Sequence, residues 1–192
     1  MKLKILLGMG LVILTLPLHA QKIKVTEGDI KTLKNESSIN IEFTYNDMRV
    51  GKFKTEADYV AKKTEEYNKK EAGKGDTWAK SWVSDREERY EPKFVELFTD
   101  NSKMKEDKNA TYTLIFNTSF TEPGFNIGVM RQNAYIDGEV TIVETKNRNN
   151  VIAKLTVSKS PGRDVMGVDF DTGWRISEAY AKAGKSLGKY IK

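Results

Sequence analysis

The sequence predicts an α+β domain with two layers, in which helices pack on one face of a four- or five-stranded, mostly antiparallel sheet. Two observations predict this class. Segments with apolar residues at every second position occupy both halves of the chain, and segments with helical spacing lie between them and at the carboxyl end. The chain has 192 residues and contains no internal repeat or low-complexity tract. We therefore expect a single domain with one hydrophobic core over residues 21–192.

Two strands are expected near the start of this domain. Ile23 and Val25 alternate with polar residues and predict a short first strand. Residues 39–46 alternate more clearly, with Ile39, Ile41 and Phe43 on the same side. A long helical stretch separates this second strand from the next, so the sequence allows these two strands to pair in parallel.

A pair of helices is expected to follow. Thr55 is a suitable N-cap, and apolar residues follow it at helical spacing. The glycines in "KKEAGKGD" end this helix, and we expect Asp76 or Thr77 to cap the next one. Pro92 fits the first turn of a helix better than its interior, so it predicts a restart or a kink.

The last third of the chain predicts three more strands and a closing helix. The strands are expected at residues 112–117, 134–142 and 151–157, with "KNRNN" as a hairpin connection before the last of them. The helix is expected from about Thr172 to the end. Its Gly184 and Gly188 each cost about 1 kcal/mol relative to alanine. For Gly184 we expect close contact with the sheet as compensation, and the alternative is a partner helix docked on the glycines.

The first twenty residues have the pattern of a secretory signal peptide. Lys2 and Lys4 precede an apolar stretch, and Ala20 provides a small residue at its end. The apolar stretch is shorter than the roughly 20 residues that a membrane-spanning helix needs. We expect cleavage after Ala20 and a mature protein in the periplasm or outside the cell, without a membrane span; the alternative is that the leader stays attached as an anchor.

Composition excludes several kinds of chemistry from that mature chain. Cysteine is absent, so disulfides and a lipid-modified cysteine are impossible, and the only histidine is His19 in the leader. Catalysis by Ser-His-Asp or Cys-His groups and most zinc or copper sites are thereby excluded. We expect no cofactor and no metal. Loss of Lys2 and Lys4 lowers the net charge from +5 to +3, and the charges are interspersed, which does not indicate nucleic-acid binding.

Residues of the carboxyl-terminal half resemble a group of small cell-envelope domains. The segments are "PGFNIGV", "AYIDGEVTIVETKNRNNVIAKLTV" and "ISEAYAKAGKSLGKYI". They are similar to relatives of the domain in the curli-secretion lipoprotein and of the amino-terminal part of TolB. The resemblance covers residues 112–192, and this chain departs from it in having no lipobox cysteine. It implies an interaction or assembly role in the bacterial envelope and assigns no catalytic residue.

Two apolar groups are candidates for binding. Trp78 and Trp82 lie on one helix face, where they either pack in the core or form a platform that stacks on sugars. Residues 124–133 begin with Gly124 and contain Phe125, Ile127, Met130 and Arg131. This segment is either a bulged connection that folds its apolar residues over one end of the sheet or an exposed apolar lip that grips a partner.

Acidic residues give two further hypotheses. Asp169 and Asp171 have the spacing that begins a calcium loop, although Tyr180 stands where that loop needs a glutamate; the alternative is that Asp171 or Thr172 caps the last helix. The second hypothesis is a glycosidase-type hydrolase, which remains an alternative because carboxylates are abundant, although no spacing predicts a catalytic pair.

The expected function is therefore binding of a protein or envelope component by an exported, non-enzymatic domain. The alternatives are a small-ligand or glycan-binding module and a carboxylate-based hydrolase.

Overall fold

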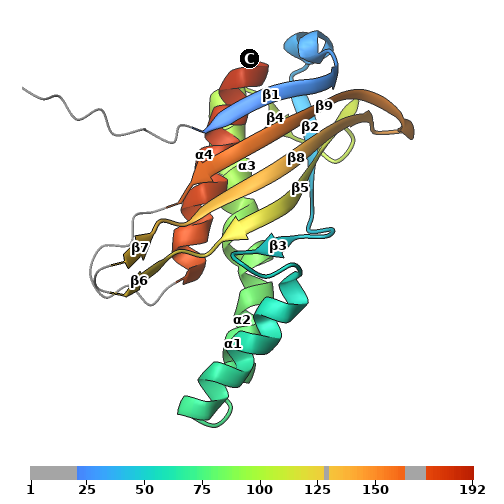
Figure 1. Ribbon diagram of the computed structural model, residues 1–192. Coiled ribbons are helices and arrows are strands. Elements are labelled where there is room, and N and C mark those ends of the chain that lie inside the picture. The colour runs from blue at the N-terminus through green and yellow to red at the C-terminus, as the bar shows by residue number, and fades with distance from the viewer. Residues whose placement is uncertain (1–20, 128–129, 163–171) are drawn as a thin grey trace, which may run out of the picture.

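The computed structural model describes residues 21–127, 130–162 and 172–192, and an open seven-stranded sheet forms one of its layers (Figure 1). The strand order is β1-β9-β8-β5-β2-β4, with β3 beside β5. The short strands β6 and β7 form a separate hairpin. The bounds are β1 Lys22–Gly28, β2 Ser38–Thr44, β3 Arg49–Val50, β4 Lys105–Glu106, β5 Tyr112–Glu122, β6 Phe125–Ile127, β7 Met130–Gln132, β8 Tyr135–Glu144 and β9 Asn147–Pro161.

The sheet is mixed: it contains antiparallel pairs, as expected, and parallel pairs as well. Strands β1, β9, β8 and β5 are antiparallel, whereas β2 pairs with β5, β2 with β4, and β3 with β5 in parallel. The α+β class is confirmed, and so is the parallel pairing of β2 with the next long strand. The expected number of strands was too low, because β3 and β4 have two residues each and no alternation that a sequence pattern can reveal.

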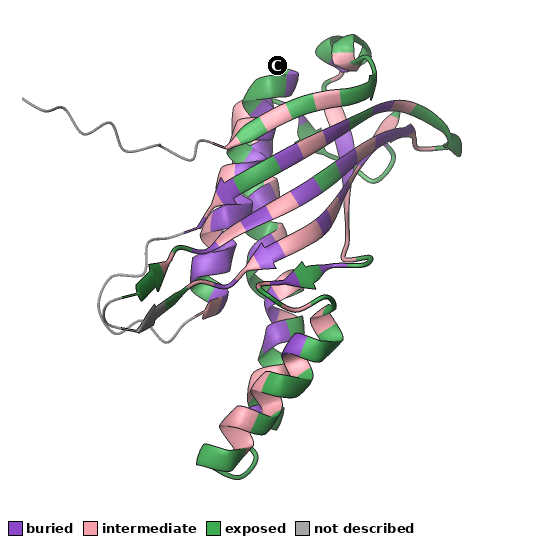
Figure 2. Cartoon of the chain, viewed as in Figure 1, coloured by how far each residue is buried: buried purple, intermediate pink, exposed green. Residues whose placement is uncertain are grey.

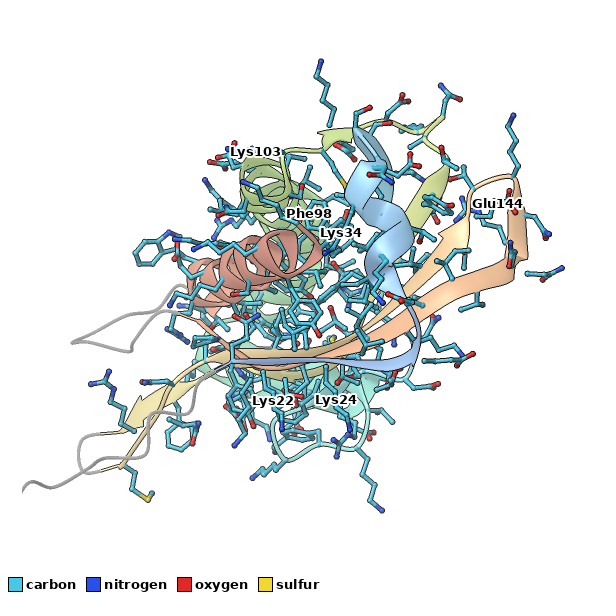
Figure 3. The ribbon with its side chains drawn as sticks, turned by 90° about the horizontal axis from the view of Figure 1, so that it is seen from above. Lys22, Lys24, Lys34, Phe98, Lys103 and Glu144 are labelled. Atoms are coloured by element: carbon cyan, nitrogen blue, oxygen red, sulfur yellow. The ribbon has the colours of Figure 1, made fainter. Side chains whose placement is uncertain are left out.

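Helices α3 and α4 cover one face of the sheet (Figure 1). Seen from above, Lys22 and Lys24 of β1 lie on the opposite side of the sheet from these helices (Figure 3). The helical bounds are a 3-10 helix at Ile30–Asn35, α1 Glu56–Lys70, α2 Lys74–Asp85, a π-helical turn at Arg86–Tyr90, α3 Glu91–Ser102 and α4 Thr172–Ile191. No helix among the described residues is both long enough and apolar enough to cross a membrane.

Helices α1 and α2 form a hairpin that projects past the end of the sheet, which we call the helical arm (residues 56–85) (Figure 1). Both paired helices were expected to cover the sheet, and for the arm this prediction was wrong. The arm holds its aromatic residues between its own two helices, since Trp78 of α2 has ring contacts with Tyr59 and Tyr67 of α1. Figure 2 shows the result: the arm is mostly exposed or half-buried, whereas buried residues gather between the sheet and α3 and α4.

Helix α2 continues into α3 without a break. The π-helical turn joins them, and its wider hydrogen bond runs from the Glu91 N–H to the Arg86 carbonyl. Pro92 stands in the first turn of α3, as expected. A restart or a kink was predicted there, and the structure has this π-helical turn directly before it. Thr55 caps α1 by accepting from the Asp58 N–H at 3.1 Å, as expected. The cap expected at Asp76 or Thr77 was wrong, since α2 begins at Lys74 after Gly73, which has a φ of +80°.

The core lies between the sheet and the two covering helices. Ile136, Val140 and Ile142 face it from β8, which confirms the expected alternation of that strand. Gly138 lies in the same row because the ring of Phe116 occupies the space of a side chain: a Cβ at Gly138 would lie 2.4 Å from that ring. Phe94 and Phe98 of α3 enter the core with their rings stacked at 6.0 Å.

The two glycines of α4 lie against helix α3. A Cβ at Gly184 would lie 2.2 Å from the Phe94 carbonyl oxygen, and a Cβ at Gly188 would lie 2.6 Å from that of Phe98. Close contact was expected, but with the sheet; the neighbour is a helix of the same chain. Both glycines therefore let two helix backbones approach to a distance that no side chain permits.

This geometry predicts that Gly184→Ala destabilises the fold by about 1–3 kcal/mol, although alanine is the better helix former. The cause is that the new methyl group must displace the α3 backbone at Phe94. Urea denaturation measures the change. Lys185→Ala, on the exposed side of the same helix, is the control and should change stability by less than about 0.5 kcal/mol. Equal stability of the two variants would contradict the close packing.

Candidate functional site

A partly buried polar network joins the helical arm to the body of the domain. Glu56, at the start of α1, accepts a hydrogen bond from the Trp82 indole at 2.5 Å and forms an ion pair with Arg86. The Arg86 guanidinium also stacks on the Tyr45 ring, 4.0 Å from its centre. Tyr45 donates to the Glu91 carboxylate at 3.0 Å. One set of contacts therefore joins the residue after β2, the arm, the π-helical turn and the start of α3.

The electrostatics of this network indicate a structural role. Burial raises the pKa of the Tyr45 hydroxyl well above its usual range, so this group stays protonated and acts as a donor. Burial also raises the pKa of Glu91, and the neighbouring Glu87 contributes in the same direction. Each side chain of this network has a partner within the network, and none of these contacts prepares a nucleophile.

The two tryptophans predicted as candidate binding residues are brought together in the arm. The side chain of Trp82 is 5% exposed and that of Trp78 is half-buried, with their ring centres 5.6 Å apart. Tyr59 lies against both rings. The rings therefore pack on one another and on Tyr59, which favours core packing over a sugar-stacking platform.

A second candidate, the segment after Gly124, forms the β6–β7 hairpin. We call the exposed part of this hairpin the lip, defined by Phe125, Met130 and Arg131. Phe125 is 44% exposed and Met130 is 55% exposed. Gly124 starts the hairpin with a φ of +75°, where a Cβ would lie 2.9 Å from two backbone atoms. The expected alternative, apolar residues folded over the end of the sheet, does not describe these two side chains; that of Ile127 lies outside the described part.

A hollow of about 660 Å³ lies beside the lip. Arg131 and Lys159 bring positive charge to it, and Tyr135 contributes an aromatic ring. The remaining lining residues are Gln132, Asn133, Ala134 and Pro161. Arg131 is oriented by a hydrogen bond from its Nε to the Asn133 side chain at 3.2 Å. The hollow is therefore polar and basic, next to an apolar rim.

The base of the lip is fixed to the domain by buried polar contacts. Arg175 of α4 is 4% exposed, and its Nε donates to the Pro123 carbonyl at 3.2 Å. Glu122, the last residue of β5, accepts from the Gly124 N–H at 3.0 Å. Because both contacts hold the backbone that enters β6, the start of the hairpin has a defined position.

Two hollows bring described carboxylates together: Asp47, Asp137 and Glu139 line one, and Glu87, Glu91, Glu96 and Glu106 line the other. The two described carboxylates whose pKa is raised, Glu91 and Glu122, are not neighbours. Burial raises the pKa of Glu122, against the effect of the Gly124 hydrogen bond, and burial likewise raises that of Glu91. Glu91 begins α3 and Glu122 ends β5, and none of the described hollows is lined by both. Within residues 21–127, 130–162 and 172–192, no group of acidic residues is arranged to hold a metal ion. Asp169 and Asp171 lie outside the described residues.

Sequence reasoning missed two residues at this end of the molecule. Trp174, in the first turn of α4, is 40% exposed, and Arg175 beside it is buried. The sequence "TGWRIS" showed that both residues lie near the start of a helix. It did not show that Arg175 is buried, because a buried arginine and an exposed one look the same in a helical pattern. The Arg175 guanidinium donates to the Pro123 carbonyl, 52 positions away, and to the Thr172 hydroxyl, and the distant contact leaves no local signal in the sequence.

No family model and no curated protein matches the chain. Among solved structures, a PelC dodecamer from Paraburkholderia phytofirmans matches with a TM-score of 0.39 and 11% identity, over 85% of this chain and 97% of the PelC chain. A second structure, of a single-substitution variant of the same dodecamer, matches with the same values.

The packing of the tryptophans predicts their response to a quencher. In variants that keep a single tryptophan, Trp82 should emit at shorter wavelength and resist acrylamide, whereas Trp174 should be quenched readily. Steady-state fluorescence measures both. Ready quenching of Trp82 would contradict its burial and restore the sugar-platform interpretation.

The raised pKa of Glu122 predicts a pH-dependent gain from Glu122→Gln. The folded protein holds this proton more tightly than the unfolded chain, so the carboxylate lowers stability increasingly as pH rises above the ordinary value of 4.5. Glutamine keeps an oxygen for the Gly124 N–H and carries no charge. Thermal unfolding should show a higher Tm than wild type at neutral pH and no gain below pH 4.5, whereas Glu139→Gln, at an exposed site, should show neither.

Proposed function

We propose that this protein is an exported domain of the bacterial cell envelope that binds another protein or envelope component and does not catalyse a reaction. The leader pattern of residues 1–20 supports export. The absence of histidine and cysteine from residues 21–192 supports a non-enzymatic role. The similarity of residues 112–192 to envelope domains points to the same compartment.

The observation that carries this proposal is the exposed apolar lip. Phe125 and Met130 are 44% and 55% exposed, on a hairpin that extends beyond the sheet (Figure 1). Phenylalanine, methionine and arginine are enriched in protein interfaces relative to other surface. The lip presents all three within seven residues, counted from Phe125 to Arg131.

The way in which the lip is held also fits a binding role. The contacts of Arg175 with Pro123 and of Glu122 with Gly124 fix the entry to the hairpin. A surface that is already ordered loses less conformational entropy when a partner binds. The basic hollow beside the lip adds a polar rim, as interfaces commonly have around an apolar centre.

A small-ligand or glycan-binding module is the second candidate, and the hollow of about 660 Å³ favours it. Its volume lies within the range of small-molecule sites, and Tyr135 with Arg131 and Lys159 offers a ring and two cations. Such a ligand would need no exposed Phe125 or Met130, so the two candidates separate experimentally.

The proposal predicts that Phe125→Ser together with Met130→Ser removes a partner from the protein. Crosslinking in envelope extracts, followed by copurification, should recover a partner with the wild type and lose most of it with the double variant. The control is Val151→Ser, which removes a 38%-exposed apolar side chain at the far end of the sheet and should leave recovery unchanged. Thermal unfolding of all three proteins confirms that they are folded.

Two outcomes would contradict this assignment. Equal recovery with the double variant would show that the lip is not the contact surface. Absence of any specific partner of the wild type, combined with saturable binding of a saccharide lost in Arg131→Ala, would favour the small-ligand module instead.

A further inference from the structure

Gln21 occupies an unusual position in both the sequence and the fold. It directly follows Ala20, after which the leader is expected to be cut, and it directly precedes β1 at the edge of the sheet. Leader removal would therefore make it the first residue of the mature chain, with a free α-amino group.

Only one of the two polar atoms in the side-chain amide of Gln21 has a hydrogen-bond partner among the described residues. Its Oε1 accepts a hydrogen bond from the Ser186 hydroxyl of α4 at 2.9 Å. Its Nε2 is buried and has no hydrogen-bond partner among the described residues. Buried polar groups are nearly always paired in folded proteins, so a lone amide nitrogen at this position calls for an explanation.

We propose that Gln21 is converted to pyroglutamate once the leader has been removed. The α-amino nitrogen attacks Cδ of its own side chain, a C–N bond forms, and the bond from Cδ to Nε2 breaks. Nε2 leaves as ammonia with the proton from the amine, so no oxidant, reductant or second substrate is needed. This modification rests on the proposed export, because only a cut after Ala20 frees the amine.

The product fits the observed contacts better than the glutamine does. The atom that leaves is Nε2, the one without a partner, whereas Oε1 remains as the lactam carbonyl and can still accept from Ser186. Ring closure changes only the α-nitrogen and the side chain of Gln21 and leaves its carbonyl group and all later residues as they are. The pairing of β1 with β9, which begins with Lys22 opposite Ser158, is therefore retained. The mature chain would then begin with an uncharged ring packed on α4 and would resist aminopeptidases.

Intact-mass spectrometry of natively exported protein tests the proposal, with fragmentation to place the change on residue 21. We expect a chain of residues 21–192 that is lighter than its sequence by one ammonia. The matched control is Gln21→Asn, whose shorter side chain cannot close the five-membered ring, and which should have its full sequence mass.

The failure of each idea is recognisable in the same spectrum. Residues 21–192 with an intact glutamine would overturn the cyclisation and leave export standing. A chain that keeps Met1, or begins at another residue, would overturn the cut after Ala20 and the cyclisation with it.

A second measurement tests the structural reason. The same purified chain, compared before and after treatment with a glutaminyl cyclase, should gain thermal stability on ring closure, since the unpaired nitrogen is removed. Ser186→Ala should reduce that gain, because it removes the donor that holds the carbonyl. A lower Tm after closure would contradict the role assigned to the buried nitrogen.

Discussion

The approach of α4 to α3 is the constraint on which the rest of the structure depends. Gly184 and Gly188 let the α4 backbone approach the α3 backbone at Phe94 and Phe98, whose side chains are fully buried in the core beneath the sheet. Tyr180, on the same helix, is fully buried and shares a hydrogen bond of 2.6 Å with Thr118 of β5. Because α3 continues through the π-helical turn into α2, this one helix pair also sets the direction of the arm.

Charged groups at the two ends of this assembly have different environments. At the arm, Glu56 and Arg86 are mostly shielded from solvent and satisfy each other and the Trp82 indole. Removal of one partner there would leave a poorly solvated charge, which is costly. At the lip, Arg131 is exposed and borders a basic hollow. The arm joint is therefore best understood as structural, and the lip is the surface that we propose for recognition.

The sequence was sufficient where a local pattern determines structure. Alternation placed Ile136, Val140 and Ile142 in the core, and helical spacing with a capping threonine located α1. It was insufficient where the outcome depends on a distant segment. No residue near Gly184 in the sequence indicates whether a helix or a sheet will pack against it. The amphipathic pattern of α1 is likewise compatible with a projecting arm and with a helix that covers the sheet. For the candidate site, the segment after Gly124 was predicted from its composition, whereas the contact of the buried Arg175 with Pro123 joins residues 52 positions apart and has no local sequence signal.

The parallel pairing of β2 with β5 has a consequence for how the chain folds. Asn40 and Thr113, which share a hydrogen bond in this pair, are 73 positions apart, with the arm and α3 between them. Strands β5, β8 and β9 are consecutive antiparallel neighbours apart from the small hairpin, so they can assemble through short loops. Closing the longer loop carries a larger entropic cost and raises the contact order, which slows folding. We therefore expect the β5–β8–β9 meander to form early and the amino-terminal half of the domain to be incorporated last.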